Sequence, residues 1–382
     1  MRRLGVFVLA ALLALSLAAC SRQPAQQAQE PAEIVIGQFG SLTGTTATFG
    51  ISTRNGVQMA TDEVNTSGGL LGKQVRMVVE DDQGKPEEAQ TVVTKLVNKD
   101  RVVAVLGEVA SSRSLAAAPV CQQNRVPMIT PSSTNPKVTQ IGEFIFRVCF
   151  IDPFQGFVMA KFSAGTLKLK NVAILRDIKN DYSVGLAAVF RENFTRMGGT
   201  IVADESYSEG DTDFSAQLTS IKAKNPEGIY VPGYYTEVGL IARQARKLGI
   251  AAPLMGGDGW DSPRLWEIGG EALNNCYFSN HYSVDDPSPA IQKFVSEYRQ
   301  RYKETPDALA ALGYDAARIL YDSIRKSGST DGAKLRDAIA SVKDFPGVTG
   351  KITIDASRNA VKPAVVLRIQ DGKFQYQETV TP

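Results

Sequence analysis

The chain has 382 residues, of which 43% are hydrophobic, and this length and composition allow two domains with sizeable cores. Its 42 basic and 40 acidic residues give a formal net charge of +2, and the two signs alternate along the chain. This balance is typical of ordinary solvated surfaces and gives no indication of nucleic-acid binding.

The first twenty residues predict export and lipid attachment. Two arginines precede the apolar run Leu4–Leu17. Because a helix needs roughly 20 apolar residues to span a bilayer, this shorter run predicts a cleaved signal peptide over residues 1–19. The run ends in Leu17-Ala18-Ala19-Cys20, a lipobox in which Cys20 would carry the lipid. We therefore expect the chain in the cell envelope, anchored by lipid outside the cytoplasm in the periplasm or on the outer surface. A plain secreted protein is the alternative.

Residues 21–32 contain no large apolar side chain and, together with Cys20, predict a disordered tether. From Glu33 onward, short β-rich runs alternate with longer helical ones. In the first series we expect strands at Ile34–Gly37, Gln74–Glu80, Val102–Leu106, Pro127–Ile129 and Phe144–Cys149. The helices between them are expected at Gly50–Asn65, Pro86–Asp100 and Ser112–Asn124.

A second series of the same kind follows. Strands are expected at Asn171–Leu175, Thr200–Ser206, Gly228–Val231 and Pro253–Met255, and helices at Pro153–Leu167, Asp181–Met197, Phe214–Ala223 and Glu237–Leu248. The remaining chain predicts helices at Ala290–Lys303, Ala308–Lys326 and Gly332–Ser341, and strands at Lys351–Ile354 and Val365–Ile369. Runs that are apolar on both faces indicate parallel sheets covered by helices, so we expect two successive α/β units.

Catalytic and metal-binding patterns are scarce in this sequence. His281 is the only histidine, no GxSxG motif accompanies it, and a histidine metal cluster is impossible. If Cys20 carries lipid, Cys121, Cys149 and Cys276 remain, which allows at most one disulfide and leaves its pairing open. Small buried hydrophobic side chains are the simplest interpretation of these cysteines. We expect no cofactor, no metal and no enzymatic activity.

Two hydroxyl-rich loops follow neighbouring strands of the first unit. Ser111 and Ser112 lie just before a helix, whose N-terminal N–H groups favour an anion. Ser132, Ser133 and Thr134 lie between two prolines after the next strand. Because ligands of open α/β sheets bind beyond the carboxyl ends of the strands, these loops predict a cradle for a carboxylate. An ordinary helix cap and a polar turn are the alternatives.

Two loops of the second unit carry an acid and aromatic rings. Tyr234 follows one strand, and Asp258 and Trp260 follow the next within a glycine-rich turn. A carboxylate beside aromatic rings suits an ammonium group through ion pairing and cation–π attraction. The alternatives are a turn or cap role for Asp258 and interdomain packing for the rings. Together, the four loops predict a zwitterionic amino acid held between two lobes.

From Glu33 to about Thr379 the chain resembles the periplasmic binding proteins of the branched-chain amino acid transport family, the leucine/isoleucine/valine type. The fragments that carry this resemblance are Gly40-Ser41-Leu42-Thr43-Gly44, Gly68-Gly69-Leu70-Leu71-Gly72-Lys73, Asp81-Asp82, Ala110-Ser111-Ser112, Ile129-Thr130-Pro131, Asp152-Pro153-Phe154-Gln155-Gly156 and Arg243-Gln244-Ala245-Arg246. It implies a type I periplasmic-binding-protein fold with two Rossmann-like parallel-sheet lobes joined by three crossovers. We expect lobe 1 over residues 33–152 and 281–349, and lobe 2 over residues 153–280 and 350–379.

The resemblance also implies roles for individual residues. Ser111 and Thr134 would bind the ligand carboxylate with their side chains, and Ser132 would use its backbone. Asp258 would bind the ammonium group, with Tyr234 beside it. The residues expected along the side-chain part of the pocket are Phe49 and Tyr182, with Phe150 and Trp260 added for their apolarity and their expected place in the cleft.

The implied function is capture of an amino acid and delivery to an ABC permease with its ATPase, by a monomer held at the membrane through its lipid. Leucine-type members have Glu where Asp258 stands and Tyr where Phe49 stands, so the ligand could be a branched-chain amino acid or a related one. A ligand-sensing module that signals to a receptor and a binder of an amide or other small carboxylate remain alternatives.

Overall fold

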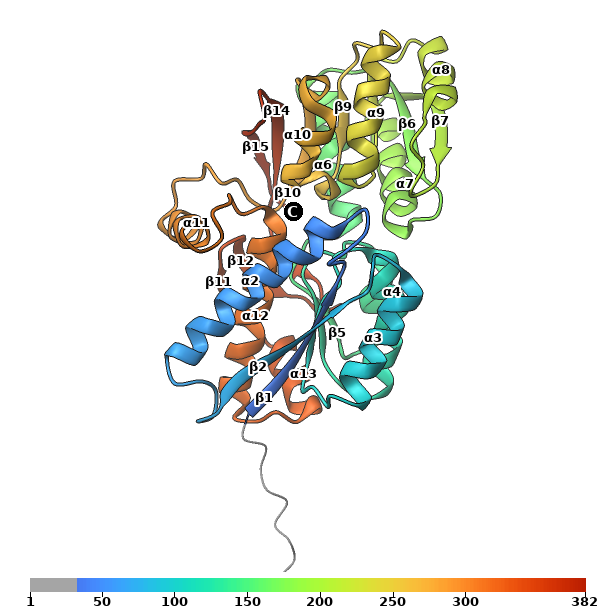
Figure 1. Cartoon of the computed structure of the whole chain (residues 1–382). Coiled ribbons are helices and arrows are strands. Elements are labelled where there is room, and N and C mark those ends of the chain that lie inside the picture. The colour runs from blue at the N-terminus through green and yellow to red at the C-terminus, as the bar shows by residue number, and fades with distance from the viewer. Residues whose placement is uncertain (1–32) are drawn as a thin grey trace, which may run out of the picture. The chain divides into compact units, whose positions relative to one another are not determined.

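The computed structural model describes residues 33–382, so the predicted signal peptide 1–19, the predicted lipidation site Cys20 and the predicted tether that ends at residue 32 lie outside the described part. Two sheets flanked by helices organise the described chain (Figure 1). We call the five-stranded sheet with its helices lobe 1, and the seven-stranded sheet with its helices lobe 2. The predicted α/β fold with two lobes is confirmed.

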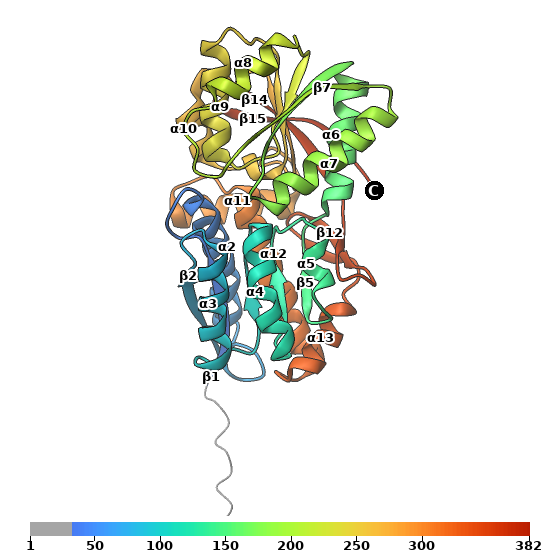
Figure 2. The same ribbon diagram turned by 90° about the vertical axis from the view of Figure 1, so that its right-hand side faces the viewer.

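Lobe 1 has a fully parallel sheet with strand order β2-β1-β3-β4-β5. Its strands are β1 (Glu33–Gly40), β2 (Gln74–Asp81), β3 (Val105–Leu106), β4 (Met128–Thr130) and β5 (Ile145–Arg147). Its helices are α2 (Ala47–Thr66), α3 (Pro86–Asn98), α4 (Ser111–Gln123), α5 (Lys137–Gln140), α11 (Pro289–Tyr302), α12 (Ala308–Ser327) and α13 (Gly332–Ala340). Helices α2 and α12 cover one face, and α3 and α4 cover the other (Figures 1 and 2).

The alternation of strand side chains explains these two layers. In β1, Ile34 and Ile36 join the core under α2 and α12, whereas Val35 and Phe39 join the core under α3 and α4. Successive side chains of a strand point to opposite faces, so a run that is apolar throughout fills both layers.

Lobe 2 has a mixed sheet with strand order β15-β14-β10-β9-β8-β6-β7. The parallel strands are β6 (Asn171–Asp177), β7 (Thr200–Tyr207), β8 (Gly228–Tyr230), β9 (Leu254–Gly256) and β10 (Cys276–Asn280), and the antiparallel hairpin is β14 (Ala364–Gln370) and β15 (Lys373–Val380). The helices are α6 (Asp152–Lys161), α7 (Asp181–Arg196), α8 (Ser215–Ala223), α9 (Tyr235–Lys247) and α10 (Pro263–Gly269). Short helical turns are η1 (Phe162–Thr166), η2 (Asp258–Trp260) and η3 (Gly270–Leu273).

The chain passes between the lobes three times, after β5, after β10 and between β13 (Ala360–Val361) and β14. A small third sheet is formed by β11 (Phe345–Gly347), β12 (Gly350–Ile354) and β13. Ile352, Ile354 and Ala360 belong to the lobe 1 core. The expected start of the last lobe 2 segment at residue 350 is therefore too early, because β12 and β13 pack on lobe 1 before the third crossover.

Short sequence features explain where several helices begin and end. Proline occupies the first turn of α3, α6, α10 and α11, where a missing N–H costs no hydrogen bond. The Asp307 carboxylate caps α12 by accepting from the N–H of Ala310 at 2.9 Å, and Gly328 ends the helix with a φ of 59°. Strand β10 and helix α10 were not predicted from the sequence. The segment 153–167 was predicted as one helix, but in the structure it consists of α6 followed by the π-helical turn η1.

Candidate ligand-binding site

The sequence-predicted loops meet where the carboxyl ends of the strands of the two lobes face each other. Ser132 follows β4 in lobe 1, and Asp258 follows β9 in lobe 2. The Ser132 hydroxyl donates to Asp258 Oδ2 across the cleft at 3.2 Å. The lobes therefore contact each other directly at the predicted site.

Asp258 is a buried carboxylate with neutral hydrogen-bond donors on both oxygens. It is 4% exposed, and its backbone N–H donates to Gln155 Oε1 at 2.8 Å. Its Oδ1 accepts from the Tyr182 hydroxyl at 3.0 Å. Its Oδ2 accepts from Ser132 and lies 2.9 Å from Nε2 of His281. None of these partners is a fixed cation, so the negative charge of Asp258 has no cationic partner among its hydrogen bonds.

Aromatic rings from both lobes form the wall beside this carboxylate. Phe49, from the start of α2, meets Tyr234 edge to face with centroids 5.3 Å apart. Tyr234 stacks on Tyr182 with centroids 5.4 Å apart and an interplanar angle of 14°. Burial raises the pKa of both tyrosines, so both hydroxyls stay protonated and can donate hydrogen bonds.

The cavity at this place measures about 10 Å³ and is lined by Phe49, Val109, Ser132, Tyr182, Tyr234, Asp258, Gly259 and Leu309. This volume is about that of one water probe, so the lobes are closed tightly on one another. Five of the predicted residues line it, and three others, Val109, Gly259 and Leu309, were missed. Their small or apolar side chains carry no sequence signal that separates a cavity wall from an ordinary core.

The two hydroxyl-rich loops that were predicted to form a carboxylate cradle contact each other. Ser132 lines the cavity, whereas Ser111 and Thr134 do not. Ser111 is 1% exposed, and its Oγ accepts from the backbone N–H of Asn135 at 3.3 Å, which leaves its own proton available for donation. The backbone carbonyl of Thr134 accepts from the N–H of Asp152 at 3.0 Å, and the Thr134 side chain is fully buried. Burial raises the pKa of Asp152 to about 7, and the Thr134 hydroxyl opposes this rise.

Phe150 and Trp260 do not line the cavity, contrary to their expected place in the cleft. Trp260 is fully buried in lobe 2, where its Nε1–H donates to the carbonyl of Val231 at 2.9 Å and its ring stacks on Phe278. Phe150 lies one layer behind Asp258, stacked on the His281 ring. Apolarity and loop position did not reveal that both rings turn inward.

His281 is a neighbour of Asp258 that was not among the predicted site residues. As the only histidine it suggested at most a catalytic arrangement, yet its Nε2 and the Ser132 hydroxyl both contact the same oxygen of Asp258. A nucleophile relay would need a hydrogen bond from the serine to the histidine. Instead, Ser132 and His281 both contact the Asp258 carboxylate, which therefore lies at the centre of a cluster of hydrogen-bond donors.

Known proteins share this architecture and much of the sequence. The family described as periplasmic binding protein matches residues 33–373. A Leu/Ile/Val-binding protein of Rhizobium johnstonii is 34% identical over 324 residues, which cover 84% of this chain and 87% of that protein. The chain belongs to the periplasmic binding proteins of the branched-chain amino acid type.

Two solved structures resemble this periplasmic binding protein over nearly their whole length. A leucine-binding protein from Thermotoga maritima is 42% identical with a TM-score of 0.88, covering 91% of this chain and 99% of that one. A branched-chain amino acid transporter substrate-binding protein from Streptococcus pneumoniae, solved with isoleucine, is 37% identical with a TM-score of 0.88, covering 92% and 100%. These likenesses confirm the predicted family and its type I fold.

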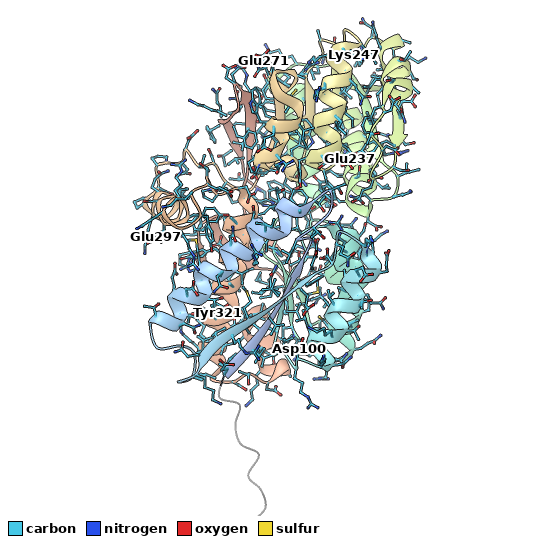
Figure 3. All side chains as sticks on the ribbon, in the orientation of Figure 1. Asp100, Glu237, Lys247, Glu271, Glu297 and Tyr321 are labelled. Atoms are coloured by element: carbon cyan, nitrogen blue, oxygen red, sulfur yellow. The ribbon has the colours of Figure 1, made fainter. Side chains whose placement is uncertain are left out.

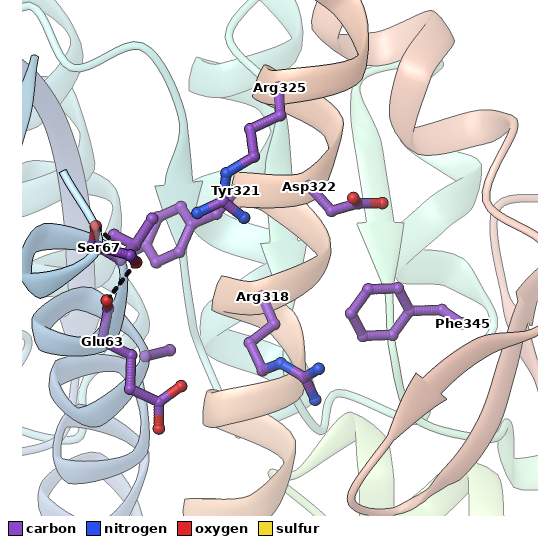
Figure 4. A pocket seen from close by; sticks show the side chains of 9 residues that line it. Glu63, Ser67, Arg318, Tyr321, Asp322, Arg325 and Phe345 are labelled. Carbon is purple, nitrogen blue, oxygen red and sulfur yellow. Dashed lines mark hydrogen bonds between the residues drawn. The ribbon is translucent and has the colours of Figure 1, made fainter. Parts of the chain in front are cut away.

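The binding protein has a second, wider hollow between α2 and α12, within lobe 1 (Figure 4). Its volume is about 260 Å³. Its two carboxylates already have partners, because Glu63 accepts from the Tyr314 hydroxyl at 2.8 Å and Asp322 pairs with Lys326 at 2.7 Å. No predicted site residue lines this hollow, and closure of the lobes would not enclose a ligand there.

The three cysteines of the described chain are structural. Cys121, Cys149 and Cys276 are buried and unpaired, so the disulfide that the sequence allowed does not form among them. Burial raises the pKa of Cys121 and of Cys149 to about 12, which keeps both thiols unreactive. Between residues 33 and 382, no group of His, Cys, Asp and Glu side chains is arranged to hold a metal ion, and no helix is long and apolar enough to cross a membrane.

Proposed function

We propose that this protein captures an amino acid between its lobes and delivers it to an ABC importer. The observation that carries this proposal is the Asp258 carboxylate, which is buried at the cleft and contacted by neutral donors from both lobes. An ammonium group that replaced the Ser132 hydroxyl at Oδ2 would add the missing opposite charge, and charge-assisted hydrogen bonds are stronger than neutral ones.

The other end of the ligand would meet lobe 1. The Ser111 and Thr134 hydroxyls lie on adjoining loops, and Ser111 stands in the first turn of α4, where free backbone N–H groups favour an anion. An α-carboxylate there and an α-ammonium at Asp258 would span the two lobes. The aromatic wall of Phe49, Tyr182 and Tyr234 would then receive an apolar side chain, as expected for a branched-chain or related amino acid.

Binding at this place requires the lobes to move apart and close again. The present cavity of about 10 Å³ is too small for an amino acid, and the Ser132–Asp258 hydrogen bond closes it. The three crossovers would act as the hinge. The lipid on Cys20 would hold the protein at a membrane surface outside the cytoplasm and, if the permease sits in the same membrane, raise its effective concentration there.

A thermal-shift screen of the full-length chain against all common amino acids and their amides tests this function. A ligand present at about 100 times its Kd adds about 2.7 kcal/mol to the free energy of unfolding, which is readily detected. We expect one or a few apolar amino acids to raise the Tm, and their amides and amine-free analogues to have much weaker effects. A screen in which no amino acid raises the Tm would contradict the proposal.

A further inference from the structure

The single histidine connects the proposed ammonium site to the hinge. His281 follows β10 at the point where the chain leaves lobe 2 for the second crossover. Its Nε2 lies 2.9 Å from Asp258 Oδ2, and its side chain is fully buried. Its ring stacks on Phe150, with centroids 3.8 Å apart and an interplanar angle of 20°. Phe150 lies in the first crossover, so His281 contacts one crossover and begins another.

The environment of His281 keeps its ring neutral. Burial lowers the pKa of His281 to about 4, and the charge of Lys362 acts in the same direction, while Asp258 opposes the shift. The other titratable groups around the Asp258–His281 pair are Asp152, Asp261, Tyr182, Tyr230 and Cys149.

The hydrogen-bond chemistry then determines the tautomer. An ionised carboxylate can only accept hydrogen bonds, so the contact with Asp258 Oδ2 requires the proton on Nε2. The remaining ring nitrogen, Nδ1, is buried and has no hydrogen-bond partner among residues 33–382. The ring therefore makes a single strong polar contact, and that contact is with the proposed ligand anchor.

We propose that His281 is the positioning residue that orients Asp258 for an amine-bearing ligand. This inference rests on the proposed function. A neutral donor fixes the carboxylate without cancelling its charge, whereas a fixed cation would compete with the ligand's ammonium group. Stacking on Phe150 fixes the ring in turn, so the direction of the Asp258 carboxylate is set by the crossover segments. The site should therefore favour an amine over a neutral group at this position.

Two variants separate this role from simple filling of space. His281→Gln keeps an N–H donor, and His281→Phe keeps a ring that can stack on Phe150 but has no donor. The ligands compared are L-leucine and 4-methyl-2-oxopentanoate, which has the same skeleton and carboxylate with a carbonyl in place of the amine. Calorimetry on the full-length chain, purified in mild detergent without a histidine tag, gives both Kd values.

We expect His281→Phe to weaken L-leucine binding by about tenfold or more and to change oxo-acid binding by less than about threefold. His281→Gln should recover most of the L-leucine affinity. If both variants weakened both ligands equally, His281 would only fill space and the inference would be wrong. If the unchanged protein bound no amino acid, the proposed function itself would fail.

Nuclear magnetic resonance of the ligand-free protein tests His281 without any ligand. Because the chain has one histidine, ¹⁵N-histidine labelling gives a single imidazole whose signals need no further assignment. We expect a neutral ring with the proton on Nε2 from pH 7 down to about pH 5. A proton on Nδ1, or a charged ring at pH 6, would overturn the positioning role whatever the ligand is.

Discussion

The Arg113 guanidinium of lobe 1 pairs with the Glu209 carboxylate of lobe 2, with Nη2 and Oε1 2.9 Å apart. Arg113 is 2% exposed, and its Nη1 donates to the hydroxyls of Ser41 at 2.9 Å and Thr46 at 2.8 Å. These contacts within lobe 1 hold the guanidinium in place for Glu209. Because the pair joins the lobes directly, it stabilises the closed arrangement and must separate when the cleft opens.

The variant Glu209→Gln should therefore weaken ligand binding without touching the ligand. Loss of one partly buried ion pair is expected to raise the Kd about three- to tenfold, mainly through faster dissociation. Stopped-flow measurement of the dissociation rate checks this. Glu271→Gln, an exposed change at the far end of lobe 2 (Figure 3), is the control and should leave the rate unchanged. Equal rates for the two variants would show that the pair does not hold the lobes together.

The carboxylate cradle is tested by Ser111→Ala. This change removes a hydroxyl that is predicted to donate to the ligand, and a hydrogen bond to a charged group contributes about 1.5–3 kcal/mol. We expect the Kd to rise at least about tenfold. Ser132→Ala is the matched control, because Ser132 is predicted to contribute through its backbone, while its hydroxyl donates to Asp258 and not to the ligand carboxylate. A larger loss for Ser132→Ala than for Ser111→Ala would contradict these assignments.

Trp260→Phe separates a core role from a cleft role. The change removes the hydrogen bond from Nε1 to the Val231 carbonyl and leaves space in the lobe 2 core. We expect the free energy of unfolding to fall by about 1–3 kcal/mol with the order of ligand preference unchanged. Chemical denaturation and the amino-acid screen measure the two effects. A changed ligand order with unchanged stability would place Trp260 in the cleft after all.

The contrast between Asp258 and Trp260 shows what the sequence could predict. Both follow β9 in one glycine-rich turn, and strand order alone placed that turn at the cleft. A buried carboxylate needs donors, so its place at an interface of loops could be foreseen. The direction of an apolar ring two residues later depends on the local 3₁₀ turn η2 and on the nearby Val231 carbonyl, and no periodicity encodes these.

The same limit applies to the lobe boundary and to His281. Residues 350–361 were assigned to lobe 2 with the last strands of the chain, but Ile352 and Ile354 are buried in the same core as side chains of α12 and α13, so β12 and β13 belong to lobe 1. Such an assignment depends on contacts with distant helices. His281 likewise contacts Asp258 and Phe150, which belong to other segments of the chain.

Asp82 should make stability depend on pH. Burial, together with the negative charge of Glu108, raises the pKa of Asp82 to about 8, and Ser41 Oγ lies within 3.0 Å of both carboxylates. Between pH 4 and 8 the folded protein holds a proton that the unfolded chain has released, so the stability due to this proton is lost as the pH rises through that window. The variant Asp82→Asn has no carboxyl proton to lose at this position, so its free energy of unfolding should not fall in this way. Compared with the unchanged protein, the variant should therefore become progressively more stable between pH 5 and pH 9.

Thermal unfolding at pH 5, 7 and 9 measures this difference. Each unit of pKa shift corresponds to about 1.4 kcal/mol, so even part of the shift is detectable. The variant Asp344→Asn changes an exposed residue and is the control. Its Tm, plotted against pH, should run parallel to that of the unchanged protein. If the plot of Tm against pH for Asp82→Asn also ran parallel to that of the unchanged protein, Asp82 would be ionised in the folded state throughout this range, and the prediction would be wrong.

The central claim is that Asp258 binds the amine of an amino-acid ligand, and calorimetric titration of L-leucine into the unchanged protein and into Asp258→Asn tests it most directly. The asparagine keeps the size of the side chain and removes the charge. We predict a Kd raised by about ten- to a hundredfold for L-leucine. We also predict little change for 4-methyl-2-oxopentanoate, which lacks the amine. An unchanged Kd for L-leucine in Asp258→Asn would contradict the account.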